Sequence, residues 1–353
     1  MAKKENLDNT PKTRSIIFMK MLMFDYRESE SEFFEKNDFP DFDITFIKEP
    51  LNEMTNLTDE QYEETDIISV FINSSVTEEV IKKFRNLRII ATRSTGYNHI
   101  DLKTCTQNNI AVFNVEQYGR NAVAEYTIGL IISLVRNILP AYLDVQKNLV
   151  NHPKYEGRNL SALTLGIVGC GSIGAAVAKI AKSFGMKVIT YSYMKNSDVN
   201  DILEYVSLDE LLSNSDIITL HIPYTKDTYH FLGKNEFNKI KEGAYIINTA
   251  RGELIDLVAL YENMLNGKIK GAALDVLECE YKVLYDEILN NSNEIDQKCI
   301  TSAFATQKLL GMNNVIITPH IAYNTKESVE TLLENTFNNI RDYIKGEHHL
   351  RVC

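Results

Sequence analysis

Short apolar runs alternate with amphipathic stretches from residue 163 onward, and this alternation restricts the fold more than any other feature of the sequence. Nearly unbroken apolar character, typical of strands buried on both faces of a sheet, marks five runs: 165–169, 187–191, 216–222, 244–248 and 271–276. Between these runs, apolar residues recur with helical spacing over 175–184, 208–213 and 257–265. Strands that alternate with helices predict βαβ units and a parallel sheet covered by helices.

The N-terminal third carries a smaller version of the same pattern. We expect a helix over 77–84 and strands over 16–24, 67–72, 88–92 and 111–113. A long helix is predicted over 122–138, ending before Pro140. An amphipathic helix over 326–344 is expected to return to the N-terminal unit. The chain of 353 residues therefore predicts two α/β domains.

Composition and charge exclude several classes of protein. With 44% hydrophobic and 24% charged residues, the chain has the balance of a soluble globular protein. No apolar run approaches the ~20 residues that cross a bilayer, and the polar first 15 residues do not resemble a signal peptide. We therefore expect a cytoplasmic protein with no membrane partner. The net charge of −11 argues against nucleic-acid binding.

The cysteines indicate neither a disulfide framework nor a zinc site. They are odd in number, scattered along the chain and never spaced as CxxC: Cys105, Cys170, Cys279, Cys299 and Cys353. We expect reduced thiols and no metal.

A glycine-rich turn follows the strand predicted over 165–169. Gly169 permits the tight turn, Gly171 lets the backbone approach a pyrophosphate, and Gly174 lets the helix and the strand pack closely. The N–H groups at the start of the next helix would then face the phosphates. Because this turn stands inside a series of βαβ units, it favours a dinucleotide site over a tight turn without a ligand.

The residue expected to bind the adenosine ribose departs from the usual pattern. Dinucleotide folds place an acidic residue about 20 residues after the turn, and Ser192 stands there. A carboxylate would repel a 2′-phosphate, so its absence, with Lys195 nearby, leaves NADP open. Alternatively, Ser192 hydrogen-bonds an ordinary NAD ribose. We expect NAD as the cofactor.

Polar and ionisable residues follow three later strands, at the edge where open α/β sheets hold their ligands. They belong to the segments 248–252 (NTARG), 275–280 (DVLECE) and 317–320 (ITPH). Hydride transfer to a 2-oxo acid needs a cation for the carboxylate, a general acid for the oxygen and a carboxylate that orients this acid. Arginine, histidine and glutamate are the natural residue types for these roles, and their joint appearance after a dinucleotide turn favours a dehydrogenase.

Together these motifs resemble those of the D-isomer-specific 2-hydroxyacid dehydrogenases, and the D-lactate dehydrogenases among them most closely. The resemblance runs from about Phe18 to the last helix. Besides the glycine turn and 248–252, it rests on 93–101 (RSTGYNHID), 274–276 (LDV) and 318–320 (TPH). It implies a Rossmann-type doubly wound cofactor domain and a smaller flavodoxin-like α/β substrate domain. The implied activity is hydride transfer between a nicotinamide cofactor and a small 2-oxo or D-2-hydroxy acid, with pyruvate reduction expected first.

The resemblance also implies roles for single residues. Arg251 would bind the substrate carboxylate and carbonyl, His320 would be the acid–base, and Glu280 would pair with His320 and favour its imidazolium form. The substrate pocket would be lined by Thr95, Gly96, Tyr118 and Tyr323. Beyond the glycine turn and Ser192, the implied dinucleotide contacts are Ser172, Ile173, Ile222, Pro223, Thr228, Thr249, Ala250 and Asp275. We expect His99, His221 and His230 to be ordinary structural histidines.

The domain organisation that the resemblance implies is discontinuous. A substrate domain over 16–117 and 321–353 would close over a cofactor domain at 118–320, with 1–15 as a loose extension. A homodimer would form largely through the cofactor domains. Gly119 and Arg120 stand where lactate-type members often have Ser-Pro, and this departure affects the expected shape of the hinge between the two domains. The long polar stretch 281–311 matches an insertion of those members.

Other functions on the same fold stay open. A redox-sensing corepressor would keep the dinucleotide site but show negligible turnover. A dehydrogenase for a larger acid would share every motif, and the acids left open are pyruvate, branched 2-oxo acids, phenylpyruvate and 2-oxoglutarate. Formate dehydrogenase by resemblance pairs its histidine with glutamine, so Glu280 speaks against it.

Overall fold

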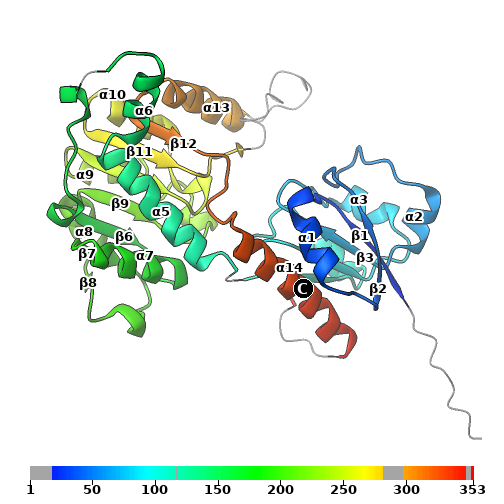
Figure 1. Cartoon of the computed structure of the whole chain (residues 1–353). Coiled ribbons are helices and arrows are strands. Elements are labelled where there is room, and N and C mark those ends of the chain that lie inside the picture. Colours follow the sequence, from blue (N-terminus) through cyan, green and yellow to red (C-terminus); the bar gives the residue numbers. More distant parts are fainter. Residues whose placement is uncertain (1–17, 117, 151, 281–296, 347–350) are drawn as a thin grey trace, which may run out of the picture. The chain divides into compact units, whose positions relative to one another are not determined.

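The computed structural model describes residues 18–116, 118–150, 152–280, 297–346 and 351–353, which belong to two compact units (Figure 1). Unit 1 comprises Met1–Tyr118 and Val329–Cys353, and unit 2 comprises Gly119–Ser328. The predicted extension 1–15 lies outside the described residues. Unit 2 continues past the predicted boundary at residue 320, because the N–H groups of Ile321 and Ala322 bind a carboxylate of the same unit.

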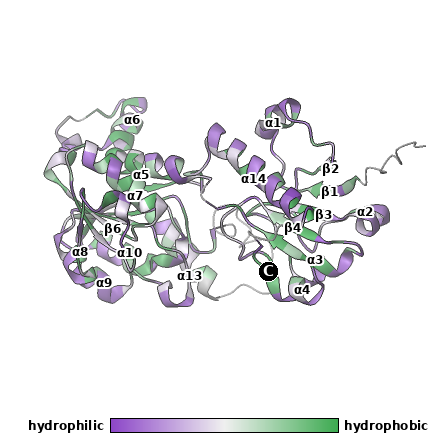
Figure 2. Cartoon of the chain, turned by 90° about the horizontal axis from the view of Figure 1, so that it is seen from below, coloured by the Kyte–Doolittle hydropathy of each residue, from purple (hydrophilic) through white to green (hydrophobic). Residues whose placement is uncertain are grey.

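Unit 1 contains a five-stranded parallel sheet in the order β2-β1-β3-β4-β5. This is the strand order of flavodoxin-like folds. The strands are β1 (Met19–Met23), β2 (Phe42–Phe46), β3 (Ile67–Val70), β4 (Ile89–Thr92) and β5 (Ala111–Phe113). The helices are α1 (Ser31–Lys36), α2 (Asp59–Glu64), α3 (Glu78–Lys83) and α4 (Leu102–Gln107), with the larger part of α14 (Lys326–Ile344). Figure 2 colours β3 and β4 green, as hydrophobic, and much of α1 and α2 purple, as hydrophilic.

Unit 2 contains a seven-stranded parallel sheet in the order β12-β11-β10-β9-β6-β7-β8. Six of these strands repeat the doubly wound order of dinucleotide-binding folds, and β12 extends the sheet at one edge. The strands are β6 (Thr164–Val168), β7 (Lys187–Tyr191), β8 (Glu204–Tyr205), β9 (Ile217–Leu220), β10 (Ala244–Asn248), β11 (Ile269–Leu274) and β12 (Val315–Ile317). The two sheets confirm the predicted α/β fold class.

Helices cover both faces of the larger sheet because successive strand residues point to opposite sides. On β9, Ile218 and Leu220 pack into one core cluster, whereas Ile217 packs into the other. The first cluster is closed by α8 (Leu208–Asn214), α9 (Lys234–Lys239), α10 (Leu257–Leu265) and α13 (Gln297–Leu310). The second is closed by α5 (Arg120–Val135) and α7 (Ser172–Ser183).

The long helix predicted over 122–138 is two helices. Helix α5 ends at Val135, Asn137 adopts a left-handed φ of 53°, and α6 (Ile138–Gln146) leaves at an angle of 63°. Pro140 therefore stands in the first turn of α6, where its missing N–H costs no helical hydrogen bond, and not beyond the end of a helix. Asparagine tolerates the left-handed conformation, which explains where the helix breaks.

Within the described residues, no single helix has both the length and the apolar composition needed to span a membrane. Helices α5 and α6 would reach that length and composition only when taken together across their bend.

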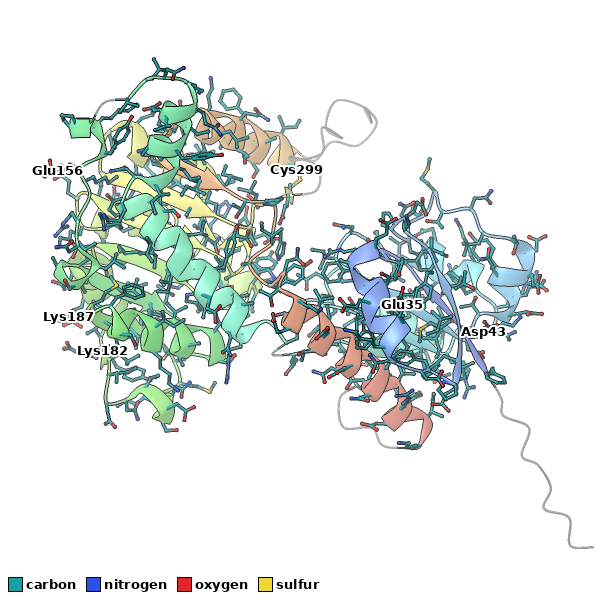
Figure 3. All side chains as sticks on the ribbon, viewed as in Figure 1. Glu35, Asp43, Glu156, Lys182, Lys187 and Cys299 are labelled. Atoms are coloured by element: carbon teal, nitrogen blue, oxygen red, sulfur yellow. A yellow bond between two sulfur atoms is a disulfide. The ribbon has the colours of Figure 1, made fainter. Side chains whose placement is uncertain are left out.

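The expectation that all cysteines are free thiols is wrong. Cys279 and Cys299 form a disulfide that joins the segment after β11 to the start of α13 (Figure 3). Their Cα atoms lie 5.6 Å apart. Sequence spacing could not reveal this pair, because the two residues meet only through the packing of α13 against the sheet. Cys105, Cys170 and Cys353 are free.

Candidate active site

The glycine turn joins β6 to α7 as the sequence predicted. Gly169 has a left-handed φ of +94°, and a Cβ on Gly174 would lie 2.1 Å from the carbonyl oxygen of Gly169. A Cβ on Gly171 would meet no atom within 4 Å, so the space before the helix is open. Gly171 also caps α7 without a side-chain hydrogen bond, which leaves N–H donors of the first turn facing this space. A pyrophosphate fits such a cradle.

Ser192 and Lys195 lie on the loop after β7. The Ser192 hydroxyl donates to the carbonyl of Met194, at 2.9 Å. Lys195 is exposed, and its ammonium lies 5.7 Å from the centre of the Tyr205 ring. The loop is tied to the glycine turn through Asn196, whose side chain donates to the carbonyl of Cys170 at 3.3 Å. Ser192 thus has a local partner, and Lys195 stands in solvent.

The other expected dinucleotide positions lie on the ends of neighbouring strands. Ile222 and Pro223 follow β9, and the hydroxyl of Thr228 donates back to the carbonyl of Pro223, at 2.9 Å. Thr249 and Ala250 follow β10; the hydroxyl of Thr249 lies 2.9 Å from that of Thr127 on α5. Parallel strands bring these ends to one edge of the sheet, the same edge as the glycine turn.

Arg251 follows β10 on a turn that Asn248 holds. The Asn248 side chain accepts from the N–H of Ala250 at 3.0 Å and donates to the carbonyl of Arg251 at 2.8 Å. The guanidinium of Arg251 donates to the carbonyl of Ala250, at 2.7 Å. Among the ion pairs of the described residues, none neutralises Arg251 with a carboxylate. It is therefore a half-buried cation able to bind an anionic group.

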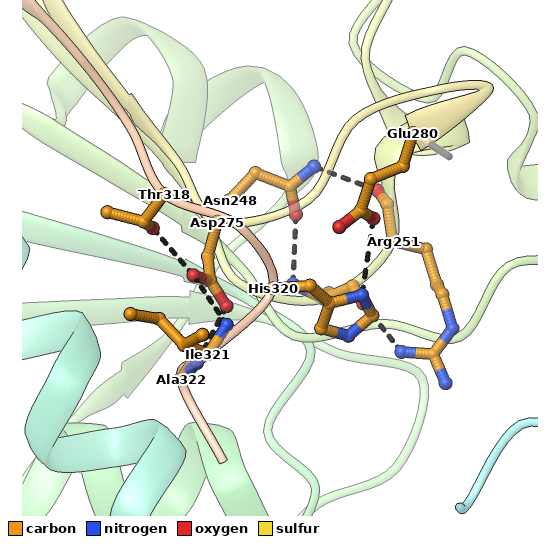
Figure 4. Close-up of polar contacts among 9 residues, drawn as sticks. Asn248, Arg251, Asp275, Glu280, Thr318, His320, Ile321 and Ala322 are labelled. Atoms are coloured by element: carbon orange, nitrogen blue, oxygen red, sulfur yellow. Dashed lines mark hydrogen bonds and ion pairs between the residues drawn. The ribbon is translucent and has the colours of Figure 1, made fainter. Parts of the chain in front are cut away.

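Asp275 holds the turn that carries His320. One carboxylate oxygen accepts from the Thr318 hydroxyl at 2.6 Å and from the N–H of Ile321 at 3.0 Å, and the other accepts from the N–H of Ala322 at 2.8 Å (Figure 4). The N–H of His320 donates to the carbonyl of Asp275, at 2.8 Å. Burial raises the pKa of Asp275, although these hydrogen bonds oppose the shift. The side chain expected to contact the dinucleotide thus orients the histidine loop.

His320 and Glu280 meet side chain to side chain. The Nδ1 atom of His320 lies 3.2 Å from a carboxylate oxygen of Glu280, and both side chains are about one quarter exposed, at 26% and 24%. In Figure 4, Glu280 lies above the His320 ring and the guanidinium of Arg251 lies to its right. Because Glu280 engages Nδ1, the Nε2 atom of His320 remains for another partner. An arginine, a glutamate and a histidine that are far apart in the sequence thus gather at one edge of the sheet.

The expected pocket residues divide between the units. Tyr323 belongs to unit 2, is buried, and its ring centre lies 6.3 Å from that of His320. A Cβ on Gly119 would lie 3.2 Å from the Cβ of Tyr323, so a larger residue there would press on this tyrosine. Tyr118 belongs to unit 1, as do Thr95 and Gly96. In that unit the Thr95 hydroxyl donates to the carbonyl of Val115, at 3.0 Å.

The sequence reasoning missed Asn248 and Thr318 as residues that shape the site, although both stood inside quoted motifs. Each is a short polar side chain at the end of a buried strand, and that position was the available signal. For His230, which we expected to have a structural role, the structure places the Nε2 atom 3.3 Å from a carboxylate oxygen of Glu278. No sequence signal joins His230 to Glu278.

The other two histidines match the expectation of structural roles. His221 follows β9, and its ring nitrogen lies 2.9 Å from the Thr219 hydroxyl. Burial lowers the pKa of His221 to about 3. In unit 1, burial lowers the pKa of His99 to about 4, and its ring lies 3.1 Å from the Thr92 hydroxyl. Both rings are therefore neutral at physiological pH, which makes them poor proton donors.

The fold and this site define a dinucleotide-binding protein of the dehydrogenase class. The family model described as "D-isomer specific 2-hydroxyacid dehydrogenase, NAD binding domain" matches residues 128–322. This match covers more than half of the chain, and the chain belongs to the D-isomer specific 2-hydroxyacid dehydrogenase family. The predicted resemblance is thereby confirmed.

Named relatives agree with this assignment. The aromatic 2-oxoacid reductase of Clostridium sporogenes is 39% identical over 293 residues, which cover 82% of this chain and 86% of the relative. The D-lactate dehydrogenase of Lactiplantibacillus plantarum is 32% identical, with 93% of this chain and 97% of the relative covered. Among solved structures, the D-lactate dehydrogenase of Aquifex aeolicus, complexed with NAD and lactic acid, superimposes with a TM-score of 0.78 at 34% identity and covers 93% and 96% of the two chains.

Proposed function

We propose that this chain reduces a small 2-oxo acid to the D-2-hydroxy acid with NADH, and that pyruvate, reduced to D-lactate, is its substrate. The observation that carries the proposal is the His320–Glu280 contact beside the Arg251 guanidinium. These are the proton donor, its orienting carboxylate and the carboxylate-binding cation that the reaction requires. The D-lactate dehydrogenases among the relatives support this substrate.

Each residue has a distinct role in the proposed reaction. The guanidinium of Arg251 binds the substrate carboxylate and stabilises the negative charge that develops on the C2 oxygen. His320 gives its Nε2 proton to that oxygen, while Glu280 accepts from Nδ1 and holds the ring in place. When bound, the nicotinamide supplies the hydride to C2.

The dinucleotide would be held by the cradle before α7. Gly171, Ser172 and Ile173 would offer backbone N–H groups to the pyrophosphate, with Gly169 and Gly174 giving the turn its shape. The rest of the dinucleotide would be surrounded by residues at the ends of the neighbouring strands. These are the loop of Ser192, residues 222–228 and 249–250, and the turn that Asp275 holds. We propose NAD as the cofactor, with NADP tolerated, because Ser192 carries no charge to repel a 2′-phosphate.

Reduction of a larger 2-oxo acid is the second candidate. The aromatic 2-oxoacid reductases of Clostridium sporogenes, 39% and 41% identical to this chain, favour it. As substrate-binding residues we propose Thr95, Gly96, Tyr118 and Tyr323; the ring centre of Tyr323 lies 6.3 Å from that of His320. These residues would contact the substituent on C2 of the 2-oxo acid. The space that they leave for this substituent would decide between pyruvate and a larger 2-oxo acid.

Initial rates with a panel of 2-oxo acids test the proposal. Pyruvate, 2-oxoisocaproate, phenylpyruvate and 2-oxoglutarate are each reduced with NADH and with NADPH, and the hydroxy acid formed is resolved into its enantiomers. The proposal expects the D-isomer, with the highest kcat/KM for pyruvate. A maximum for phenylpyruvate would favour the second candidate. Absence of turnover with every acid, despite NADH binding, would indicate a binding module instead.

We also propose a homodimer that forms through unit 2. A run of large apolar side chains is exposed on α6 and the residues that follow it, which is typical of a surface that another chain covers. These side chains are Ile138, Leu139, Tyr142, Leu143, Val145, Leu149 and Val150. Light scattering on the purified protein measures the mass. A monomer at micromolar concentration would contradict this proposal.

For the compartment we propose the cytoplasm, where free thiols such as Cys105 and Cys170 persist. The disulfide between Cys279 and Cys299 would then form and open with the redox state, because reducing compartments seldom hold stable disulfides. Fractionation of the source cells tests the location.

A further inference from the structure

A second histidine–carboxylate pair lies beside the candidate active site. The Nε2 atom of His230 lies 3.3 Å from a carboxylate oxygen of Glu278, whose side chain is only 6% exposed. The His230 side chain is 27% exposed and stacks on the ring of Tyr229, with centres 3.9 Å apart. A carboxylate so deeply buried is costly unless polar groups compensate it. Neither His230 nor Glu278 binds the substrate or transfers the proton in the proposed reaction.

Glu278 stands on the segment that ends at Glu280. Its carbonyl accepts from the Ser302 hydroxyl of α13, at 3.1 Å. On the other side, Gly252 packs against the backbone: a Cβ there would lie 2.0 Å from the carbonyl carbon of Leu277 and 2.3 Å from the nitrogen of Glu278. The segment that ends at Glu280 therefore packs between α13 and the turn of Arg251.

His230 connects this segment to the Arg251 turn. Its backbone N–H donates to the carbonyl of Glu253, at 2.8 Å, while its side chain reaches Glu278. The next residues continue the attachment, because the N–H of Leu232 donates to the carbonyl of Leu254 at 2.9 Å. One residue thus contacts two loops, one carrying Arg251 and the other Glu280.

Left-handed backbone conformations occur at residues of both histidine–carboxylate pairs and of the segment between Glu278 and Glu280. Among the described residues, seven other than glycine have a left-handed φ, and four of them are Asn or Asp, which adopt it at little cost. The other three are His230, Cys279 and His320, with φ of 49°, 56° and 53°. Such conformations persist where the surroundings enforce them, and they concentrate at functional sites.

We propose that His230 and Glu278 form a positioning pair for the proposed reaction, fixing Glu280, and through it His320, relative to Arg251. The inference rests on the proposed function. Neither residue touches the reacting atoms. The side chain of His230 donates to Glu278 and thereby holds the segment 278–280 at the distance from Arg251 that proton transfer requires. Without the pair, the segment keeps its attachment to α13 through Ser302 and the Cys279–Cys299 disulfide but loses the side-chain link to the Arg251 turn, and a misplacement of about 1 Å can reduce a rate about 100-fold.

The test compares His230→Ala, His230→Gln, Glu278→Gln and the double variant of His230→Ala with Glu278→Gln. For each, kcat and KM are measured for the best 2-oxo acid, together with the NADH dissociation constant and the thermal midpoint. His230→Ala should lower kcat on the order of 10- to 100-fold with NADH affinity retained. The amide of His230→Gln can donate to Glu278 and should restore most of kcat.

The double variant should lose little more than His230→Ala alone, because one contact is removed in both. The control is Lys239→Ala, which breaks the exposed Lys239–Asp209 pair of the same unit and should leave kcat unchanged. Native kcat in His230→Ala would overturn the inference. So would equal losses of kcat in both His230 variants with equally lowered thermal midpoints, since that result indicates a general loss of stability. A wild-type protein without turnover would instead contradict the proposed function itself.

Discussion

Replacement of Asp275 by asparagine should disturb the orientation of His320 much more than it lowers the stability of the fold. The carboxylate accepts three hydrogen bonds, from Thr318, Ile321 and Ala322. In Asp275→Asn the oxygen can keep two of these donors, but the amide then faces the N–H of Ala322 and repels it. A lost hydrogen bond to a charged acceptor costs about 1.5–3 kcal/mol.

A second effect opposes this loss. Burial raises the pKa of Asp275, so the native state disfavours the ionised carboxylate. The native protein holds this proton to higher pH than the unfolded chain does, and the wild type loses the corresponding stability as the pH rises through the raised pKa. Asparagine carries no charge and escapes that loss. At neutral pH the free energy of unfolding of Asp275→Asn should therefore be about 1 kcal/mol lower than that of the wild type. This lowers the thermal midpoint by about 2–4 °C.

Turnover should respond much more strongly than stability. Displacement of the turn at Ala322 moves His320, and kcat should fall on the order of 100-fold while NADH still binds. Thermal unfolding at about pH 4 and pH 7 with steady-state kinetics tests both statements, and the variant should gain stability relative to wild type between these pH values. Native kcat, or a midpoint lowered by more than about 10 °C, would refute the reasoning.

Three further outcomes follow from the site. Arg251→Lys should raise KM for the 2-oxo acid and lower kcat, because lysine cannot form the planar bidentate contact; unchanged values of both constants would place the carboxylate elsewhere. Ser192→Asp should lower kcat/KM with NADPH and spare NADH, by repulsion of the 2′-phosphate, and a parent that already rejects NADPH by several orders of magnitude would contradict the proposed tolerance of NADP. Cys299→Ser should lower the free energy of unfolding by about 3 kcal/mol in urea, as dithiothreitol should in the wild type, whereas Cys353→Ser serves as the unaffected control.

Local patterns predicted the parallel sheets and the glycine turn, because continuous apolar runs separated by helical periodicity are typical of βαβ units. The doubly wound strand order was implied only by the resemblance to the dehydrogenase family. The positive φ of Gly169 and the close approach at Gly174 follow from one short motif. Strand β2 was missed because its sequence, FDITF, alternates and lies at the sheet edge, where only Phe42 is buried.

Contacts between distant segments were beyond the reach of sequence reasoning. The break between α5 and α6 depends on the left-handed conformation of Asn137, which a continuous apolar periodicity conceals. The Cys279–Cys299 disulfide and the His230–Glu278 pair join residues that only tertiary packing brings together. The hydrogen bonds by which Asp275 holds the turn of His320 could not be predicted either, because the resemblance marked its position without showing which N–H groups its carboxylate accepts from.

The most direct test of the whole account is the turnover of His320→Gln in reduction of the best 2-oxo acid, measured beside its NADH dissociation constant. Glutamine removes the proton donor and no dinucleotide contact, so kcat should fall about 10²- to 10⁴-fold while the NADH dissociation constant stays within about threefold of the wild type. A variant that retained the native kcat would contradict the assignment of His320 as the acid, and with it the roles given to Glu280 and Asp275.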